Sequence, residues 1–301
     1  MRCAIDRNTL DPCDILEALG LSSPTSFTAV YGGADTLIWR IEYGSQHYAL
    51  RVFRSDQTAM ARREVFAMNA ARSAGLPVPK VHAKGLWGDR PALLLDWMPG
   101  QPLKQELSMK PWRAWVYGHV LGQTQAAIHR VPSPPNLSHP VPWIEWSNPD
   151  KILRNRLLAL STGPEALLHL DLHPLNVLAE RGQVTAVLDW ANARAGDPRA
   201  DLARTASILR FGSLDIFPAA ASTVLRRALE VGWRRGYRKM AGPVSGMAPF
   251  YVWAGMVMVR DLEPRVGRPD LPWLTPAFLE RVQDWTTSWR TRARLPRAPG
   301  L

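Results

Sequence analysis

The eight residues from His169 to Asn176 carry side chains that suit phosphoryl transfer. They read His-Leu-Asp-Leu-His-Pro-Leu-Asn, and a further acid, Asp189, ends the next apolar stretch of the chain. A carboxylate such as Asp171 can orient an attacking hydroxyl and accept its proton. Oxygen donors such as Asn176 and Asp189 suit Mg²⁺, which keeps several waters and binds few protein groups. We therefore predict that Asp171 and Asn176 are catalytic and that Asn176 and Asp189 hold the metal ion.

Short apolar strands must hold these residues in place. An apolar strand from Leu167 runs directly into the His-x-Asp-x-x-x-x-Asn motif, and a hairpin with its turn at 180–182 leads to Asp189. This order matches the kinase template of a catalytic-loop Asp, an Asn five positions later and an Asp at a strand end. The structural alternative is a set of polar loop residues that cap turns. The hairpin and Asp189 favour the kinase template.

The stretch resembles the aminoglycoside phosphotransferase and choline kinase family, whose catalytic loop usually reads H-G-D-x-H-P-x-N before an I-D-W/F strand end. Residues 196–203, Gly-Asp-Pro-Arg-Ala-Asp-Leu-Ala, look like the G-D-P-x-x-D-L-A segment of that family. Leu170 and Leu175 stand where glycine is common, and neither change removes a functional group. The resemblance covers roughly residues 20–265. It implies a protein-kinase-like fold, ATP and Mg²⁺ as cofactors, and transfer of the γ-phosphoryl group to a hydroxyl of a small molecule.

The resemblance also implies supporting roles near the catalytic loop. His169 is expected to brace the loop, and Asp201 to anchor its backbone from the start of a helix. Asp197 precedes Pro198, which is also an ordinary helix start. For His173 two roles stay open, one facing the substrate and one stabilising a turn.

The first hundred residues predict mostly strands, at 27–30, 36–43, 47–53, 80–87 and 92–97, with one helix at 57–74. Gly32 and Gly33 form a turn between the first two strands, whose backbone N–H groups can approach phosphates. Arg51 lies on the third strand where kinases place a phosphate-binding lysine, and Glu64 lies on the helix where they place its partner. By resemblance, Asp96 and Met98 belong to a hinge whose backbone meets adenine. The predicted nucleotide-binding residues are Gly32, Gly33, Arg51, Glu64, Asp96 and Met98.

These elements predict an α+β, protein-kinase-like fold of two lobes. The predicted divisions are a small β-rich nucleotide-binding lobe at 1–95, a hinge at 96–100 and a larger, mainly helical lobe at 101–301. Helices are expected at 111–130 and over most of 199–292. The apolar run at 246–259 contains a proline and is shorter than the roughly 20 residues that span a bilayer, so we expect a buried helix. The proline-rich segment 131–142, followed by Trp143, Glu145 and Trp146, is either a wall of the acceptor pocket or a surface linker.

Composition favours a globular protein that attracts anions. The chain of 301 residues carries a formal net charge of +11, and its basic stretch at 226–239 is either a solvated helix face or a nucleic-acid contact. The 2 cysteines exclude a disulfide framework. The charged start of the chain is unlike a signal peptide, so we expect a cytoplasmic protein without a membrane partner.

Two competing functions are a nucleotide-binding pseudokinase without transfer activity and a basic nucleic-acid-binding protein. Arg51 in place of lysine and the two leucines in the catalytic loop motivate the first, and the basic stretch motivates the second. We favour a small-molecule kinase whose partners are ATP and a small hydroxylated substrate. The positive charge argues mildly against a polycationic aminoglycoside as the acceptor. The sequence does not indicate the acceptor, a preference for ATP over GTP, or the oligomeric state.

Overall fold

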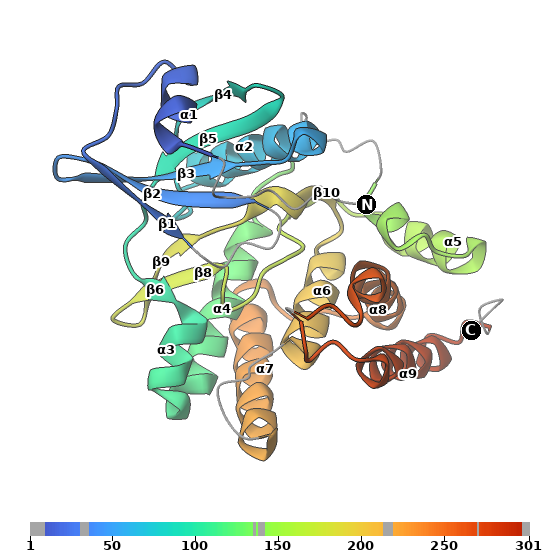
Figure 1. Ribbon diagram of the computed structural model, residues 1–301. Coiled ribbons are helices and arrows are strands. Elements are labelled where there is room, and N and C mark those ends of the chain that lie inside the picture. The colour runs from blue at the N-terminus through green and yellow to red at the C-terminus, as the bar shows by residue number, and fades with distance from the viewer. Residues whose placement is uncertain are drawn as a thin grey trace.

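The computed structural model describes residues 10–30, 36–134, 137, 142–212, 219–269 and 271–296. A small lobe built on an antiparallel sheet lies above a larger, mainly helical lobe (Figure 1). The α+β prediction is therefore confirmed. The exact divisions at residues 95 and 100 stay a prediction. Gly32 and Gly33 lie outside the described residues.

The sheet of the small lobe has five antiparallel strands in the order β1-β2-β3-β5-β4. Every predicted strand is present, close to its expected bounds. The short turns at Gly44 and Gly88 place these glycines at φ 59°, which other residues adopt only with strain. The strands are β1 (Ser26–Val30), β2 (Leu37–Tyr43), β3 (Gln46–Val52), β4 (Val81–Trp87) and β5 (Arg90–Asp96).

Two helices cover the two faces of this sheet. Because side chains alternate along a strand, Ala92 and Leu94 of β5 pack toward α1 (Pro12–Ala18), whereas Leu93 and Leu95 pack toward α2 (Thr58–Ser73). Helix α2 was predicted, but α1 was not. Its start nevertheless has a clear signal, because Asp11 accepts a hydrogen bond from Cys13 N and Pro12 occupies the first helical position.

A short extended segment connects the lobes. Strand β5 ends at Asp96, and β6 (Gln101–Pro102) pairs with β8 (Val177–Glu180) of the large lobe. Thr185 Oγ1 donates a hydrogen bond to Pro99 O. Gly100 has φ 94°, and a Cβ there would lie 2.6 Å from Thr185 Oγ1. Only glycine therefore fits at this point of the connection.

Two small sheets in the large lobe carry the catalytic loop. Strand β7 (Ala166–Leu168) pairs with β10 (Arg194–Gly196), and β6, β8 and β9 (Gln183–Val187) form the second sheet. The predicted hairpin turn is confirmed, because Arg181 and Gly182 both have positive φ between β8 and β9. The loop from His169 to Asn176 thus starts and ends at buried strands.

Helices make up the rest of the large lobe. Helix α8 is the predicted buried helix, with Phe250 and Trp253 wholly inside the core. None of the helices in the described part of the chain combines the length and the apolar character needed to cross a lipid bilayer. The helices are α3 (Leu103–Met109), α4 (Ala114–Ile128), α5 (Lys151–Leu160), α6 (Pro198–Phe211), α7 (Ala219–Ala241), α8 (Ala248–Leu262) and α9 (Pro276–Arg292).

Helices α4 and α7 pack side by side with their backbones in contact (Figure 1). A Cβ on Gly118 would lie 2.1 Å from Leu229 O, and one on Gly122 would lie 2.0 Å from Trp233 O. Gly232 and Gly236 of α7 face α4 equally closely. Small residues at these positions let the helix axes approach, so the pair forms a tightly packed core of the lobe.

The two tryptophans after the proline-rich segment have different environments. Trp143 is buried, with its ring stacked on Phe250 at 5.7 Å between centroids and its carbonyl bound by Trp253 Nε1. Trp143 is therefore part of the core. Trp146 is half-buried and lies beside two arginines described below. Residues 135–136 and 138–141 of the proline-rich segment lie outside the described residues.

Candidate active site

The backbone of the catalytic loop is held by Asp201 at the start of α6. Its carboxylate accepts hydrogen bonds from His169 N at 3.1 Å and Leu170 N at 2.7 Å. His129, the residue directly after α4, places its Nε2 2.9 Å from the same carboxylate. Burial acts to raise the pKa of Asp201, but these partners outweigh it, and the pKa lies below its ordinary value. Asp201 is thus an ionised anchor for the loop, which agrees with the role expected for it.

His169 connects the loop to the segment that carries Asp189. Its Nε2 lies 3.0 Å from Leu188 O, and its Nδ1 accepts from Asp171 N at 3.3 Å. The ring is buried against Trp190, with 4.7 Å between the centroids. With both ring nitrogens occupied by backbone groups, His169 braces the loop, as expected.

Leu170 has a backbone conformation that glycine adopts without strain. It has φ 63°, in the left-handed region, and its side chain is fully buried. The sequence singled out this leucine as a departure from the usual motif. Packing in the core compensates for the strained backbone at this residue.

The predicted catalytic residues lie next to each other in the loop. Asn176 Nδ2 donates to Asp171 O at 2.9 Å and lies 3.5 Å from Asp171 Oδ2. His173 Nε2 is 3.2 Å from the same amide nitrogen and 3.8 Å from Asp171 Oδ1. Burial lowers the pKa of His173, although Asp171 opposes the change. His173 Nδ1 also accepts from Leu175 N at 3.2 Å, which supports the turn-stabilising role for this histidine.

Asp189 is brought to Asn176 through the backbone. Leu188 N donates to Asn176 O at 2.8 Å, so the residue before Asp189 is fixed to the catalytic loop. Asp189 itself has φ 60°, and its side chain is 40% exposed toward the space between the lobes.

The donor set at this point fits a magnesium ion. The amide nitrogen of Asn176 is used within the loop, which leaves its oxygen to face a cation. Asp189 adds carboxylate oxygens, and Asp171 Oδ2 lies 3.5 Å from the amide nitrogen of Asn176. Two or three hard oxygen ligands with room for water are what Mg²⁺ requires. The residues predicted to hold the metal therefore carry suitable donor atoms, and their role as ligands stays a prediction.

Arg51 joins the small lobe to this site. Strand β3 pairs with β5 so that Arg51 lies opposite Leu93, on the face covered by α2, and this register turns Arg51 toward Glu64. Nη1 of Arg51 lies 2.5 Å from Glu64 Oε1, and Nη2 lies 3.0 Å from Asp189 Oδ1. The expected pairing of Arg51 with Glu64 is therefore present, and the contact with Asp189 adds to it.

The charges of these three residues depend on each other. Burial raises the pKa of Glu64 to about 7, although Arg51 opposes the change. Burial also acts to raise the pKa of Asp189, but Arg51 outweighs it, and the pKa lies below its ordinary value. At neutral pH Asp189 is thus ionised, and Glu64 is close to its midpoint.

The predicted hinge residues lie where the two lobes connect. Asp96 ends β5, and its side chain accepts from Lys80 N at 2.9 Å and lies 2.6 Å from His82 Nε2. Met98 is half-buried in the connecting segment. The side chain of Asp96 is therefore engaged, and its backbone N–H donates to Lys80 O at 3.0 Å. The predicted role of both residues is not tested by these contacts.

Sequence reasoning missed a group of residues that lies beside the catalytic loop. Arg204 of α6 donates from Nε to Leu170 O at 3.4 Å, so it lies directly beside Asp171. Arg194 of β10 and Arg204 both lie over the ring of Trp146. The only signal in the sequence is that each arginine interrupts a run of small or apolar residues that must be buried.

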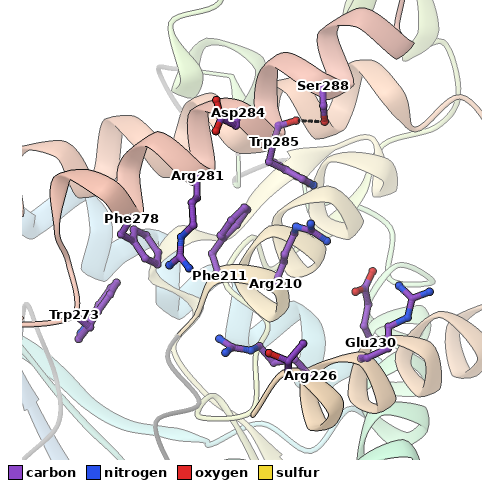
Figure 2. Close-up of a pocket in the computed structure, with 12 residues that line it drawn as sticks. Arg210, Phe211, Arg226, Glu230, Trp273, Phe278, Arg281, Asp284, Trp285 and Ser288 are labelled. Carbon is purple, nitrogen blue, oxygen red and sulfur yellow. Dashed lines mark hydrogen bonds between the residues drawn. The ribbon is translucent and has the colours of Figure 1, made fainter. Parts of the chain in front are cut away.

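A cavity of about 800 Å³ opens at a distance from these residues. Figure 2 shows it surrounded by side chains from the end of α6, from α7 and from α9. Arg210 and Phe211 lie about 15 Å along α6 from the turn that holds the catalytic loop, at 1.5 Å per residue. No residue of the catalytic loop lines this cavity, so we place the candidate active site between the lobes instead.

Comparison with known proteins identifies the family. The model of the phosphotransferase enzyme family, APH, matches residues 26–150 and 140–243. A search of curated protein sequences finds no significant match. Solved structures with this fold share 18% identity or less in the three comparisons that follow.

One similar structure is from Ralstonia eutropha JMP134 and is proposed to be an aminoglycoside phosphotransferase. The TM-score is 0.67 at 17% identity, with 93% of this chain and 96% of that chain covered. A second is the aminoglycoside phosphotransferase APH(4)-Ia in a ternary complex with AMP-PNP and hygromycin B. It has a TM-score of 0.64 at 16% identity, with 93% and 97% covered.

A third similar structure is the macrolide 2'-phosphotransferase MphH from Brachybacterium faecium. It has a TM-score of 0.52 at 18% identity, with 95% of this chain and 98% of that chain covered. These likenesses confirm the protein-kinase-like fold that the catalytic loop predicted. The family model matches well over half of the chain, within residues 26–243. The chain belongs to the phosphotransferase enzyme family, APH.

Proposed function

We propose that this protein is an ATP- and Mg²⁺-dependent kinase that transfers the γ-phosphoryl group to a hydroxyl of a small molecule. The observation that carries the proposal is the convergence of four groups from two lobes. Arg51 reaches Asp189 at 3.0 Å, the backbone of Leu188 joins Asp189 to Asn176, and Asn176 contacts Asp171. Phosphoryl transfer depends mainly on positioning and charge neutralisation, and this set supplies both.

Each residue has a defined part in the proposed reaction. The hydroxyl oxygen of the acceptor forms a bond to the γ-phosphorus, and Asp171 accepts the proton of that hydroxyl. The bond from that phosphorus to the β–γ bridging oxygen breaks, and ADP leaves with the electron pair. Arg51 binds phosphate oxygens and is itself held by Glu64. Asn176 and Asp189 would hold Mg²⁺, which supplies positive charge against the phosphates.

The arginine at position 51 supports activity rather than loss of it. A guanidinium keeps its charge at every physiological pH and can bind two phosphate oxygens at once. The partner expected of a phosphate-binding lysine, Glu64, contacts Arg51, and Asp189 contacts it as well. A pseudokinase would need a missing group, and Asp171, Asn176 and Asp189 are all present in contacting segments.

The test is transfer of label from γ-labelled ATP to a panel of amino alcohols, sugars, hydroxy acids, nucleosides and antibiotics. We expect Mg²⁺-dependent transfer to at least one class. Asp171→Asn, Asn176→Ala and Asp189→Ala should each lower the rate by about 10²–10⁴-fold. Lys84→Ala, an exposed change on β4, is the control. Full turnover in the three variants would refute the site, and nucleotide binding without any transfer would favour the pseudokinase.

A further inference from the structure

A cluster of cationic side chains surrounds Trp146 beside the catalytic loop. The guanidinium carbon of Arg194 lies 4.4 Å from the centroid of the Trp146 ring, and that of Arg204 lies 5.3 Å from it. Arg260 Nη1 donates to Trp146 O. We refer to Trp146, Arg194, Arg204, Arg260 and Asp261 as the Trp146 cluster. Its residues come from α6, α8, β10 and the turn before α5, so the fold brings them together.

Two of these arginines are buried and incompletely bonded. Arg194 and Arg204 are each only 6% exposed. Arg194 Nη1 donates to Asn192 O at 2.7 Å, but Arg194 Nε and Arg204 Nη1 have no hydrogen-bond partner among the described residues. Buried guanidinium nitrogens are normally bonded. Arg40 and Arg90 also carry one such nitrogen each, but only those of Arg194 and Arg204, among the described residues, belong to side chains on the same aromatic ring. They mark a place where acceptor atoms are expected from outside the chain.

The described side chains around the cluster carry an excess of positive charge. Asp261 is the one carboxylate in it, and its Oδ2 is 3.7 Å from Arg204 Nη2. The pKa of Arg194 is lowered to about 9, mainly by burial and also by Arg63 and Arg204, while Asp261 opposes the change. Burial raises the pKa of Asp261, and Arg204 opposes that change. A single carboxylate therefore does not balance the guanidinium groups, and buried cations without anions are unfavourable.

The cluster lies where the body of an acceptor would extend. Arg204 Nε contacts the carbonyl of Leu170, the residue before Asp171. Asp201, one turn earlier on α6, fixes the same loop. A molecule whose hydroxyl lies at Asp171 would therefore have the Trp146 cluster within reach.

We propose that the phosphoryl acceptor carries a carboxylate or phosphate group, which Arg194 and Arg204 bind beside the ring of Trp146. This inference rests on the proposed kinase function. The planar guanidinium presents paired donors that match either oxyanion. The charge of this acceptor is opposite to that of a polycationic aminoglycoside.

The first experiment measures anion binding without turnover. The intact protein is saturated with Mg²⁺ and a non-hydrolysable ATP analogue, which occupies the nucleotide site, and its melting temperature is followed against inorganic phosphate or malonate. We expect a rise in the wild type, and an apparent affinity at least tenfold weaker in Arg194→Met and Arg204→Met. Comparing phosphate with malonate distinguishes a phosphate site from a carboxylate site.

The matched control is Arg90→Met, which removes another arginine with an unpartnered buried nitrogen, on β5 of the small lobe. It should respond to both anions like the wild type. Arg204→Lys and Arg194→Lys keep the charge and lose the paired donors, so they provide the comparison if a methionine variant does not fold. The absence of any response in the wild type, or an equal response in the arginine variants, would overturn the proposal.

The second experiment compares transfer to matched alcohols, namely glycerate with glycerol, and glucose 6-phosphate with glucose. We expect the anionic member of a pair to have the higher kcat/KM, and Arg204→Lys to reduce that preference. A preference of tenfold or more for neutral or cationic acceptors would overturn the proposal. Anion binding with no transfer to any acceptor would instead count against the kinase function and leave the anion site standing.

Discussion

Arg51 Nη2 lies 3.0 Å from Asp189 Oδ1 and thereby joins the sheet of the small lobe to the catalytic segment of the large lobe. The same guanidinium contacts Glu64 at 2.5 Å, so one cation is shared by two carboxylates from different lobes. Phosphate oxygens would compete with the carboxylates for Arg51, and a metal ion would compete with Arg51 for Asp189. The relative position of the lobes therefore depends on what occupies the site.

We expect Arg51→Met to lower kcat/KM for ATP by about 10²–10³-fold, because a phosphate-binding donor is lost. Arg51→Lys keeps the charge but has one compact donor group, so it should retain more activity while losing contact with one carboxylate. Steady-state kinetics at varied ATP concentration measure this ordering. Lys84→Met on the exposed part of β4 is the control, and equal activity of the two Arg51 variants would contradict the bidentate role.

Nucleotide binding should weaken in acid because of Glu64. Its pKa of about 7 means that the carboxylate predominates above that pH and the neutral acid below it. Arg51 loses its charged partner as Glu64 takes up a proton. We expect the affinity for a non-hydrolysable ATP analogue to fall between about pH 7.5 and pH 6, and the fall should be smaller in Glu64→Gln. Titration of the analogue itself is common to both proteins and cancels in the comparison.

The same residue makes folding stability depend on pH in the opposite sense. The pKa of Glu64 is raised from 4.5 to about 7 in the folded chain, so the folded state holds a proton that the unfolded state releases. Its contribution to the free energy of unfolding should therefore decrease as the pH rises from about 4.5 to 7. Denaturant unfolding of the wild type and Glu64→Gln across this range tests the sign. The prediction would be contradicted if the free energy of unfolding of the wild type, relative to that of Glu64→Gln, increased as the pH rises from about 4.5 to 7.

Substitutions of Leu170 should change the stability of the protein in an unusual order. Leu170→Gly relieves the left-handed backbone strain, worth about 1 kcal/mol, but loses the buried side chain, worth roughly 2–5 kcal/mol. Leu170→Ala loses nearly the same packing and keeps the strain. We expect the wild type to be the most stable, the glycine variant intermediate and the alanine variant the least stable. Equilibrium denaturation measures the order, and an alanine variant more stable than the glycine variant would show that strain at φ 63° is unimportant.

Removal of the Asp201 side chain should lower the free energy of unfolding more than removal of the Asp197 side chain. Asp201→Ala leaves two buried backbone N–H groups and His129 without their acceptor, which we expect to cost about 3–5 kcal/mol. Asp197→Ala removes a helix cap and an ion pair with Arg199, and should cost about 1–2 kcal/mol.

The pH dependence provides a second test of Asp201. Its pKa is depressed in the folded state, so its contribution is present above the ordinary value of 3.8 and is lost as the pH falls through the lower folded value. Thermal unfolding of Asp201→Asn should accordingly change less with acidification than that of the wild type. Equal losses of stability in Asp201→Ala and Asp197→Ala would argue against Asp201 as the anchor of the loop.

A single methyl group should disrupt the contact between α4 and α7. In Gly122→Ala the new Cβ would meet Trp233 O at 2.0 Å, so the helices must separate, at a cost of about 3 kcal/mol. Gly163→Ala, where nothing lies within 4 Å, is the matched control. Circular dichroism melting curves compare the two, and similar melting temperatures would contradict the close contact.

Much of the fold could be predicted because its signals are local. Strands with short glycine turns, the α2 helix and the hairpin after the catalytic loop each follow from residues close together in the chain. Helices α1, α3 and α5 were missed, since short helices with one buried stripe give little periodicity. Asp11 before Pro12 and Asp150 before Lys151 mark two of their starts, and both aspartates are helix caps in the structure.

The candidate site likewise contains residues that local sequence patterns predict and contacts that depend on the tertiary fold. Asp171, Asn176 and Asp189 share one motif, and Arg51 with Glu64 could be paired by their expected positions on a strand and a helix. The contact between Arg51 and Asp189 depends on how the lobes pack, and no local pattern encodes it. The Trp146 cluster also needs the tertiary fold, because its members are dispersed between residues 146 and 261.

The hydrogen bonds of Asp201 have a further consequence for how the protein can move. His129 at the end of α4 connects Asp201 to Tyr237 of α7, because each of its two ring nitrogens lies 2.9 Å from one of them. The catalytic loop, with the proposed base Asp171, is thereby tied to a tightly packed helix pair. Any closing motion around a nucleotide should then displace the sheet and Arg51, while Asp171 stays stationary.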